Sequence, residues 1–344
     1  MKSFFLNRVI LAPYYFILAC RNYLYDKGIF KSYSFDIPII SVGNISAGGT
    51  GKTPHTEFLV KRMIQERRVA VLSRGYGRKS RGFRYVECSD SVRESGDEPL
   101  QIKRKFPEAI VVVDGNRVRA IGKLLELPPD QRPEVIILDD AFQHRRVIPS
   151  CNIVLIDHSN PPLCDNLLPF GTLRDLPSQL RRADILLVTK SPPQLSLEEQ
   201  FRWRETLLTK ERQKLFFTAL NYCDAEPLFK EGDRRYIYSR YAQLVTAIAN
   251  PIHLENQLSS SYKIIKRIRY RDHKEFKRRD VATINRISQK EGKAIIITTE
   301  KDAQRLFPLE RRVSLQTRER LFYLPIEVTF LNDSESDFIE SIFM

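Results

Sequence analysis

The chain has 344 residues, enough for two modest domains or one large one, and its 42% hydrophobic and 28% charged content is that of a globular protein. The formal net charge of +14 favours an anionic partner: a nucleic acid, an acidic membrane surface or a phosphorylated substrate. The five cysteines are odd in number and form no CxxC pair, which argues against a disulfide framework or a zinc site and for a reducing compartment.

The first 30 residues are apolar and aromatic, with basic residues at intervals. Their apolar core, Val9–Cys20, is shorter than the stretch of about 20 residues that crosses a bilayer as a helix. Three interpretations stay open: a secretory signal peptide, a core helix packed on the following domain, and an interfacial helix on an anionic membrane. We expect residues 1–30 to associate with a membrane, because aromatic side chains suit the headgroup boundary.

A strand, a glycine-rich turn and a helix follow one another between residues 38 and 63. The apolar run 38–42 predicts a buried strand, and apolar side chains at helical spacing begin after Thr53. This order is typical of a phosphate-binding loop, in which backbone N–H groups and a helix N-terminus face a phosphate. Ser46 occupies the position of the first glycine in the usual pattern. We expect the nucleotide to contact Ala47, Gly48, Gly49, Thr50, Gly51, Lys52 and Thr53.

Charged side chains follow the next two predicted strands. The strand 69–73 runs into a loop with Arg74 and Tyr76, at the edge where open α/β sheets bind ligands. Arg74 could meet a phosphate there or belong to a solvated basic turn. Asp97 lies in an acidic turn before a helix and reads as its N-cap. The strand 110–113 precedes a helix that carries Arg117, a second candidate for phosphate binding.

A β-branched strand, 134–138, ends in the two carboxylates Asp139 and Asp140. This pattern is typical of a strand whose acid holds Mg²⁺ beside the threonine of a phosphate-binding loop, here Thr53. Two carboxylates at the end of a buried strand also suggest a cation, because an unpaired buried charge is costly. Gln143 and His144 follow directly and should line the same edge.

The remaining chain predicts two domains. Strands at 152–157 and 184–189, with helices between, complete a doubly wound parallel sheet over residues 31–212. Residues 213–344 predict a smaller α/β domain, with strands at 244–249 and 294–298, tied on by extended segments at 215–220 and 321–331. His273 lies in a loop of this part and reads as a surface residue.

The order of the motifs now resembles that of a known family. The motifs are Ser-Val-Gly-Asn at 41–44, Ala-Gly-Gly-Thr-Gly-Lys-Thr-Pro at 47–54, Ser-Arg-Gly-Tyr-Gly at 73–77, Gly-Asp-Glu-Pro at 96–99, Asp-Asp-Ala-Phe-Gln-His at 139–144, Leu-Arg-Asp at 173–175, Asp-His at 272–273 and Thr-Glu-Lys-Asp-Ala at 299–303. Together they resemble the tetraacyldisaccharide 4′-kinases of lipid A synthesis over nearly the whole chain.

The resemblance implies a P-loop kinase that uses ATP and Mg²⁺ to phosphorylate the 4′-hydroxyl of a tetraacyldisaccharide 1-phosphate. It implies two α/β/α domains joined by a two-stranded linker, with the active site in the cleft. It also replaces two interpretations made above, because Asp97 becomes the general base and His273 its partner. Two positions depart from the family pattern: Asp175 stands where Glu is frequent, and Ala141 stands where Gly is frequent.

The resemblance also assigns the remaining site residues. The expected catalytic residues are Asp97, His273, Lys52, Asp139 and Asp140. The expected substrate-binding residues are Asn44, Arg74, Tyr76, Arg117, Gln143, His144 and Arg174. The expected Mg²⁺ ligands are Thr53, Asp139, Asp140 and Asp175.

The lipid substrate implies a peripheral enzyme at the cytoplasmic face of a bacterial inner membrane, and we expect a monomer. Two other classes stay open. A P-loop ATPase that acts as a partner switch would share Lys52 and Asp139 but would not need Asp97 with His273. A nucleic-acid-dependent ATPase would explain the positive charge, but we expect no nucleic-acid partner because no basic groove with interleaved aromatic residues is evident.

Overall fold

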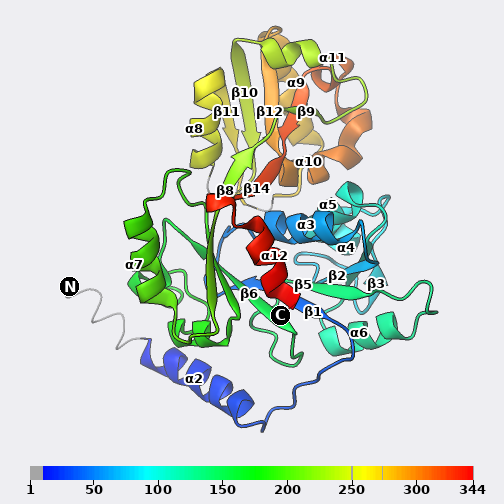
Figure 1. The fold of residues 1–344 in the computed structure, drawn as a ribbon. Coiled ribbons are helices and arrows are strands. Elements are labelled where there is room, and N and C mark those ends of the chain that lie inside the picture. Colours follow the sequence, from blue (N-terminus) through cyan, green and yellow to red (C-terminus); the bar gives the residue numbers. More distant parts are fainter. Residues whose placement is uncertain (1–10, 249–250, 273, 344) are drawn as a thin grey trace.

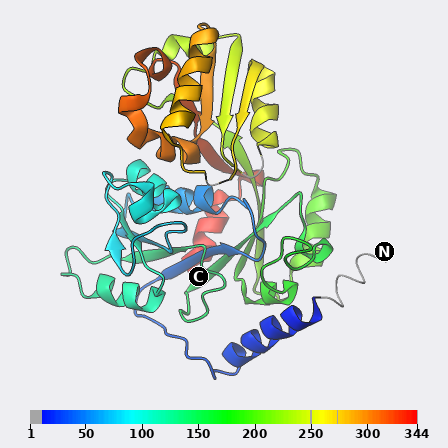
Figure 2. The ribbon, with the colours of Figure 1, turned by 180° about the vertical axis from the view of Figure 1, so that it is seen from behind.

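Two sheets, each with its own hydrophobic core, divide the molecule into a larger and a smaller domain (Figures 1 and 2). The structure is a computed structural model, and it describes residues 11–248, 251–272 and 274–343. The larger domain carries the described chain up to residue 222 and also its last strand and last helix. The mixed α/β fold with a large, mainly parallel sheet is the predicted one.

The larger domain is built on a sheet of nine strands among the described residues, in the order β14-β8-β7-β6-β1-β5-β2-β4-β3. The strands are β1 (Ile39–Asn44), β2 (Val69–Ser73), β3 (Arg84–Tyr85), β4 (Ile110–Val113), β5 (Val135–Asp139), β6 (Cys151–Asp157), β7 (Ile185–Thr189), β8 (Lys214–Tyr222) and β14 (Ile326–Phe330). All neighbours pair in parallel except the two edge strands, β3 and β14. The carboxyl ends of β1, β2, β5 and β7 therefore meet at one edge.

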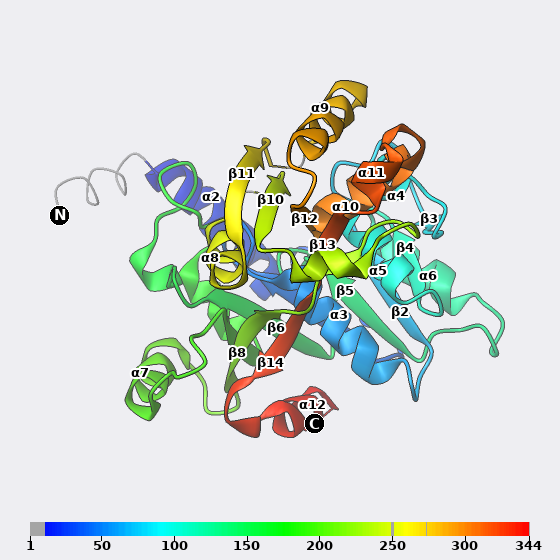
Figure 3. The same cartoon turned by 90° about the horizontal axis from the view of Figure 1, so that it is seen from above.

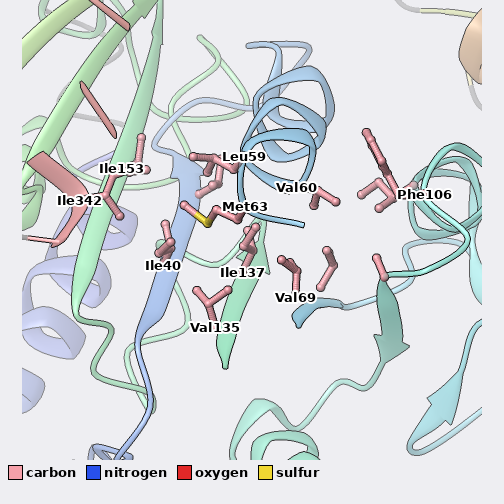
Figure 4. Packing of buried hydrophobic residues seen from close by; sticks show 14 of the residues in the cluster. Ile40, Leu59, Val60, Met63, Val69, Phe106, Val135, Ile137, Ile153 and Ile342 are labelled. Atoms are coloured by element: carbon pink, nitrogen blue, oxygen red, sulfur yellow. The ribbon is translucent and has the colours of Figure 1, made fainter. Parts of the chain in front are cut away.

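The central strands are apolar on both faces because helices cover both sides of the sheet, as parallel sheets require. On one face, Ile40 and Ile137 pack against Leu59 and Met63 of helix α3 (Figure 4). On the other face, the alternate residues of the same strands pack against helix α6. The helices of this domain are α2 (Ala12–Asp26), α3 (Lys52–Met63), α4 (Val92–Ser95), α5 (Asp97–Lys105), α6 (Arg117–Leu125), α7 (Leu197–Leu207) and α12 (Glu335–Phe343).

The smaller domain has a five-stranded sheet among the described residues, in the order β11-β10-β12-β13-β9, parallel except for β9. Its strands are β9 (Glu226–Pro227), β10 (Tyr241–Thr246), β11 (Lys263–Arg269), β12 (Ile295–Thr299) and β13 (Leu321–Leu324). Its helices are α8 (Ile252–Ser261), α9 (Arg278–Lys290), α10 (Glu300–Leu306) and α11 (Leu315–Arg318). Short 3-10 helices in the two domains are η1 (Pro162–Cys164), η2 (Pro177–Arg182), η3 (Arg234–Tyr238), η4 (Phe307–Arg312) and η5 (Leu331–Asp333).

Strands β8 and β14 connect the two domains. They pair antiparallel from Thr218 with Phe330 to Tyr222 with Ile326, and β8 also pairs in parallel with β7. The two-stranded connection is thus an extension of the larger sheet. The predicted single segment 321–331 is wrong in one respect: it divides at Pro325 into β13 and β14, which belong to different sheets.

The end of the chain returns to the larger domain. Phe338 and Ile342 of α12 are buried in the core that contains Leu59 and Phe216, and Phe338 lies 4.7 Å from Phe330 between ring centroids. The predicted division placed all of residues 213–344 outside the larger domain, and α12 corrects it. The cause is the apolar face of this helix, which only the larger core buries.

Helix α2 lies at the end of the molecule opposite the smaller domain (Figures 1 and 2). Leu11 and Leu18 are buried in the core beneath it, and Asn22 donates a hydrogen bond of 3.0 Å to Asp175. The opposite face exposes Tyr15, Phe16, Ile17 and Tyr23. One face of α2 therefore packs on the domain, whereas the other offers aromatic side chains to the surroundings. Among the described helices, none is both long and apolar enough to span a bilayer.

Candidate active site

The glycine-rich loop joins the end of β1 to the start of α3. Gly51 caps α3 with a φ of 86°, a left-handed conformation that glycine adopts without strain. Thr50, just before it, is held from two sides. Its hydroxyl accepts a hydrogen bond of 2.8 Å from the Asn44 amide, and its carbonyl accepts one of 2.9 Å from the Thr189 hydroxyl. The loop is thus fixed between the carboxyl ends of β1 and β7.

His55, in the first turn of α3, holds the loop from below. Its Nδ1 lies 2.7 Å from the Gly51 carbonyl oxygen and its Nε2 lies 2.9 Å from the Thr218 hydroxyl of β8. Burial lowers the pKa of His55 to about 4, so the ring is neutral near neutral pH. Because a carbonyl only accepts, Nδ1 carries the proton, and Nε2 accepts from Thr218. One tautomer therefore links the loop to the connecting strand.

This burial predicts an acid-dependent loss of stability. The pKa of His55 is lower in the folded protein, about 4, than its ordinary value of 6.5, so the unfolded chain binds the proton more tightly. The free energy of unfolding is therefore unaffected by this histidine above pH 6.5 and falls as the pH drops towards 4. The expected decrease over this range is about 3 kcal/mol.

Urea unfolding at neutral and acidic pH measures this loss. We expect His55→Gln to be less stable than the wild-type protein at neutral pH but to lose less stability on acidification. If the free energy of unfolding falls equally with pH in the two proteins, His55 is already protonated or accessible in the folded state.

Lys52 lies beside Asp140 and Arg174. Its Nζ is 3.8 Å from Asp140 Oδ1, and Arg174 Nη1 donates a hydrogen bond of 3.0 Å to Asp140 Oδ2 while Nη2 contacts Oδ1. Burial lowers the pKa of Lys52. Although burial acts in the opposite direction, the hydrogen bond from Arg174 and the charge of Lys52 lower the pKa of Asp140. Asp140 thus stays ionised between two cations, in the left-handed backbone conformation that Asp tolerates (φ 47°).

Asp139, the neighbouring carboxylate, has a different environment. It is buried and accepts hydrogen bonds from Ser73 at 3.1 Å and Thr56 at 3.4 Å. Burial and the nearby charges of Glu98 and Asp140 raise its pKa. A divalent cation would offset this excess of negative charge, and carboxylate and hydroxyl oxygens are the donors that Mg²⁺ prefers. The residues present therefore fit a Mg²⁺ ion bound by protein carboxylates and by a nucleotide.

The described residues of this site do not form a metal site made of protein ligands alone. No group of three or more His, Cys, Asp or Glu residues suited to a metal ion occurs within the described residues. Mg²⁺ usually keeps several waters and takes one or two carboxylates together with substrate phosphates. The pair Asp139 and Asp140 beside the phosphate-binding loop agrees with that mode of binding.

Three of the expected substrate-binding residues meet around the end of β1. Arg174 Nη2 donates a hydrogen bond of 2.5 Å to the Asn44 side-chain oxygen, and Gln143 Nε2 donates one of 2.6 Å to the Asn44 carbonyl. Arg21 of α2 donates one of 2.6 Å to the Gln143 carbonyl. The structure thus connects helix α2 directly to the edge that carries Lys52.

Asp175, the fourth expected Mg²⁺ ligand, faces another way. Its Oδ1 accepts hydrogen bonds from Asn22 and from the Leu176 N–H, and its Oδ2 lies 3.9 Å from Arg182. Oδ2 has no hydrogen-bond partner among the described residues. None of these contacts joins Asp175 to Asp139 or Asp140, so its assignment as a ligand stays a prediction.

The arginines expected to meet phosphate differ in exposure. Arg117 is buried and donates to the backbone carbonyls of Asp114 and Asp139, so it fastens the ends of β4 and β5, and burial lowers its pKa to about 10. Arg74 and Tyr76 are exposed and line a cavity of about 540 Å³ that Arg78 and Arg119 also face. Arg74 and Tyr76 thus face this cavity, whereas Arg117 has a structural task.

His144 follows Gln143 at the same edge. Burial and the charges of Arg117 and Arg74 lower its pKa to about 4, so the ring is neutral near neutral pH. It lines a cavity of about 700 Å³ between helix α2 and the sheet, together with Phe142 and Arg145. Phe142 and His144, the chain neighbours of Gln143, thus face this cavity.

Asp97 is not the N-cap that its sequence context predicts. Gly96, with a φ of 92°, precedes the helix, and Asp97 is its first residue. One carboxylate oxygen accepts a hydrogen bond of 3.1 Å from the Glu98 N–H, while the other contacts Arg305 of α10. His273 lies outside the described residues, so its expected approach to Asp97 stays a prediction.

Sequence reasoning overlooked several residues that shape this site. Ser73 and Thr56 donate hydrogen bonds to Asp139, and the negative charge of Glu98 raises the pKa of Asp139. Their positions contained a signal, because Ser73 ends a predicted strand and Glu98 follows Asp97 at a helix start. Arg305 could not be found in this way, since it is far away in the chain.

Comparison with known proteins decides the family. The family model described as "Tetraacyldisaccharide-1-P 4'-kinase" matches residues 5–343. The chain belongs to this family. Among its relatives, the tetraacyldisaccharide 4'-kinase of Phocaeicola vulgatus is 42% identical over 330 residues, which are 94% of this chain and 89% of the relative. That of Flavobacterium johnsoniae is 40% identical, over 96% of this chain and 95% of the relative.

A solved structure has the same fold. The crystal structure of LpxK from Aquifex aeolicus in complex with ATP superposes with a TM-score of 0.72 and 29% sequence identity, covering 98% of this chain and 99% of that one. The family and this neighbour confirm the predicted resemblance and the fold class. The roles of the individual site residues stay predictions.

Proposed function

We propose that the protein transfers the γ-phosphoryl group of ATP to the 4′-hydroxyl of a tetraacyldisaccharide 1-phosphate, a step of lipid A synthesis. The observation that carries the proposal is a glycine-rich loop whose Lys52 lies 3.8 Å from Asp140, in a chain that belongs to this kinase family. The ATP-bound relative agrees with ATP as the donor.

The loop between β1 and α3 is assigned to bind ATP. We assign the backbone N–H groups of residues 47–53 and the Lys52 ammonium to the β- and γ-phosphates. Phosphoryl transfer depends mainly on positioning and on stabilising charge, so these groups supply most of the catalysis. Thr53, Asp139 and Asp140 would hold Mg²⁺, with Asp175 as a further candidate. A Mg²⁺ ion held by these residues would neutralise negative charge on the phosphates.

The acceptor substrate is assigned to residues at or just after the carboxyl ends of β1, β2 and β5. We assign Arg74 and Tyr76 to the substrate because they are exposed, and Asn44, Gln143 and Arg174 because they cluster beside Lys52. His144 lines the cavity of about 700 Å³, and Arg117 positions the strand ends. Asp97 accepts the proton of the 4′-hydroxyl as general base, and His273 assists it.

A product assay tests this function. The purified protein is incubated with ATP, Mg²⁺ and tetraacyldisaccharide 1-phosphate, and the lipid is examined for a bisphosphorylated product by mass spectrometry. We expect the second phosphate on the lipid and slow ATP hydrolysis without lipid. Rapid hydrolysis that the lipid does not affect would instead favour an ATPase switch, and stimulation by nucleic acid would favour a nucleic-acid-dependent ATPase.

We further propose that the exposed face of α2 lies on an anionic membrane, as a peripheral contact at the cytoplasmic face of the inner membrane. The protein acts there as a monomer. Tyr15, Phe16, Ile17 and Tyr23 form this face, and aromatic side chains favour the headgroup region. Because α2 also contacts Gln143 through Arg21, the same helix joins the lipid surface to the acceptor side.

Paired surface variants test the membrane contact. We expect Phe16→Ser with Ile17→Ser to lower binding to anionic vesicles without unfolding the protein, because both side chains are exposed. Leu197→Ser with Phe201→Ser, on exposed positions of α7, is the matched control. High salt should weaken binding of the wild-type protein, since basic residues contribute to it. Equal vesicle binding by both double variants would exclude α2 as the membrane contact.

A further inference from the structure

Helix α10 of the smaller domain packs directly on helix α5 of the larger domain (Figures 1 and 3). Side chains of opposite charge or polarity meet along the contact. Lys301 lies 2.9 Å from Glu98, Lys105 lies 3.0 Å from Glu300, and Arg104 donates a hydrogen bond of 2.9 Å to Gln304. Every one of these pairs joins residues about two hundred positions apart in the chain. The two helices therefore form an interface between the domains with specific polar contacts.

Arg305 is the most buried cation of this interface, with 6% of its surface exposed. Its guanidinium donates a hydrogen bond of 3.0 Å to Asp302 and one of 3.3 Å to the Ala247 carbonyl, both in its own domain. Asp302 is itself fixed by the Thr299 hydroxyl and by the Ala247 N–H, each at 2.8 Å. The smaller domain thus determines where the guanidinium points.

The other end of the Arg305 fork reaches across the interface to Asp97. The two side chains form a buried ion pair, and Lys301 lies 3.8 Å from the same carboxylate oxygen. The second carboxylate oxygen accepts from the Glu98 N–H in the larger domain. Asp97 is therefore oriented by one domain through its own helix and by the other through Arg305.

We propose that Arg305 is a positioning residue for the phosphoryl transfer. It holds the Asp97 carboxylate in the orientation that accepts the hydroxyl proton, so the base is complete only when the smaller domain is docked on α5. The proposal rests on the function proposed above, in which Asp97 is the general base. Because a loose transition state requires little basicity, a base paired with a cation is compatible with this reaction.

Kinetic constants of variants test the role. We expect Arg305→Met to lower kcat by on the order of 10²-fold, as a misplaced catalytic group does, and to leave KM for ATP nearly unchanged. Arg305→Lys keeps the charge but not the forked guanidinium that spans Asp97 and Asp302. Its kcat should therefore lie between that of the wild-type protein and that of Arg305→Met. Arg93→Gln is the control, because it removes the exposed interdomain pair of Arg93 with Glu275 and leaves Asp97 untouched.

A double-mutant cycle with Asp97→Asn separates positioning from general stability. If Arg305 acts through Asp97, adding Arg305→Met to Asp97→Asn changes kcat little further. Thermal unfolding is measured for each variant, and Arg305→Lys replaces Arg305→Met in the cycle if the latter does not fold. A folded Arg305 variant with wild-type kcat, or a loss that multiplies with that of Asp97→Asn, would overturn the proposal.

The same cycle distinguishes failure of this inference from failure of the proposed function. If Asp97→Asn keeps its kcat, the role of Asp97 as general base is wrong. If Asp97→Asn loses kcat whereas both Arg305 variants and Arg93→Gln keep it, Asp97 is the base and only the role of Arg305 is wrong.

Discussion

Lys52→Ala is expected to abolish lipid phosphorylation while the protein stays folded. The ammonium is the cation of the phosphate loop, and the loss of one such charge-stabilising group lowers kcat by about 10²- to 10³-fold or more. The fold should tolerate the change for two reasons. Asp140 keeps Arg174 as its partner, and alanine favours the first turn of α3.

The matched control for this variant lies on the same helix. Lys61 is exposed and pairs at 3.1 Å with Glu327 on the surface, so Lys61→Ala should leave kcat unchanged. Circular dichroism establishes that both variants fold, and ATP binding is measured by calorimetry. Near-normal turnover by folded Lys52→Ala would remove the assignment of the phosphate loop.

The elements around the phosphate loop could be predicted from the sequence because their signals are local. Strands β2 and β4 have the predicted bounds, 69–73 and 110–113. Both are short β-branched runs that are buried on two faces, which makes them continuous apolar segments. The carboxyl ends of β2, β5 and β7 place Ser73, Asp139 and Thr189 at one edge, so the ligand-binding edge was predictable as well.

The smaller domain was harder to predict because not all of its strands are such runs. Strand β11 was overlooked, since Lys263–Arg269 is an edge strand in which basic side chains are exposed. The division of residues 321–331 at Pro325 had a local signal, because proline interrupts a strand ladder. The return of α12 to the larger core had none, since an apolar helix face does not by itself indicate which core buries it.

The part of the site that could not be predicted is formed by contacts between distant residues. The interpretation of Asp97 as an N-cap considered only its neighbours, whereas the structure gives the carboxylate a partner in the other domain, Arg305. The link from His55 to Thr218 and that from Asn22 to Asp175 are of the same kind. Such contacts depend on the packing of whole elements and leave no pattern in the local sequence.

Asp97 and His273 are expected to act as one unit, and this prediction carries the second largest effect. Asp97→Asn and His273→Ala should each lower kcat by about 10²-fold or more, the contribution of a general base. The double variant should be little slower than Asp97→Asn alone, because residues that act together are not additive. ATP affinity should barely change, since neither residue is assigned to the nucleotide.

Asp97→Asn is chosen because asparagine has nearly the shape of aspartate and leaves Arg305 one partner in its own domain. In Asp97→Asn, the Arg305 guanidinium keeps its ion pair with Asp302 at 3.0 Å, but the single amide oxygen can accept from the Glu98 N–H or from Arg305 and not from both. Thermal unfolding of the variant therefore accompanies the kinetics, so that the loss of kcat is read only from protein whose interface is intact. His158→Ala, which removes the ring that lies 5.7 Å from Trp203 in the larger domain, is the control for the histidine. Losses that multiply in the double variant would show that Asp97 and His273 act independently, and a large loss of ATP binding in either single variant would assign that residue to the nucleotide.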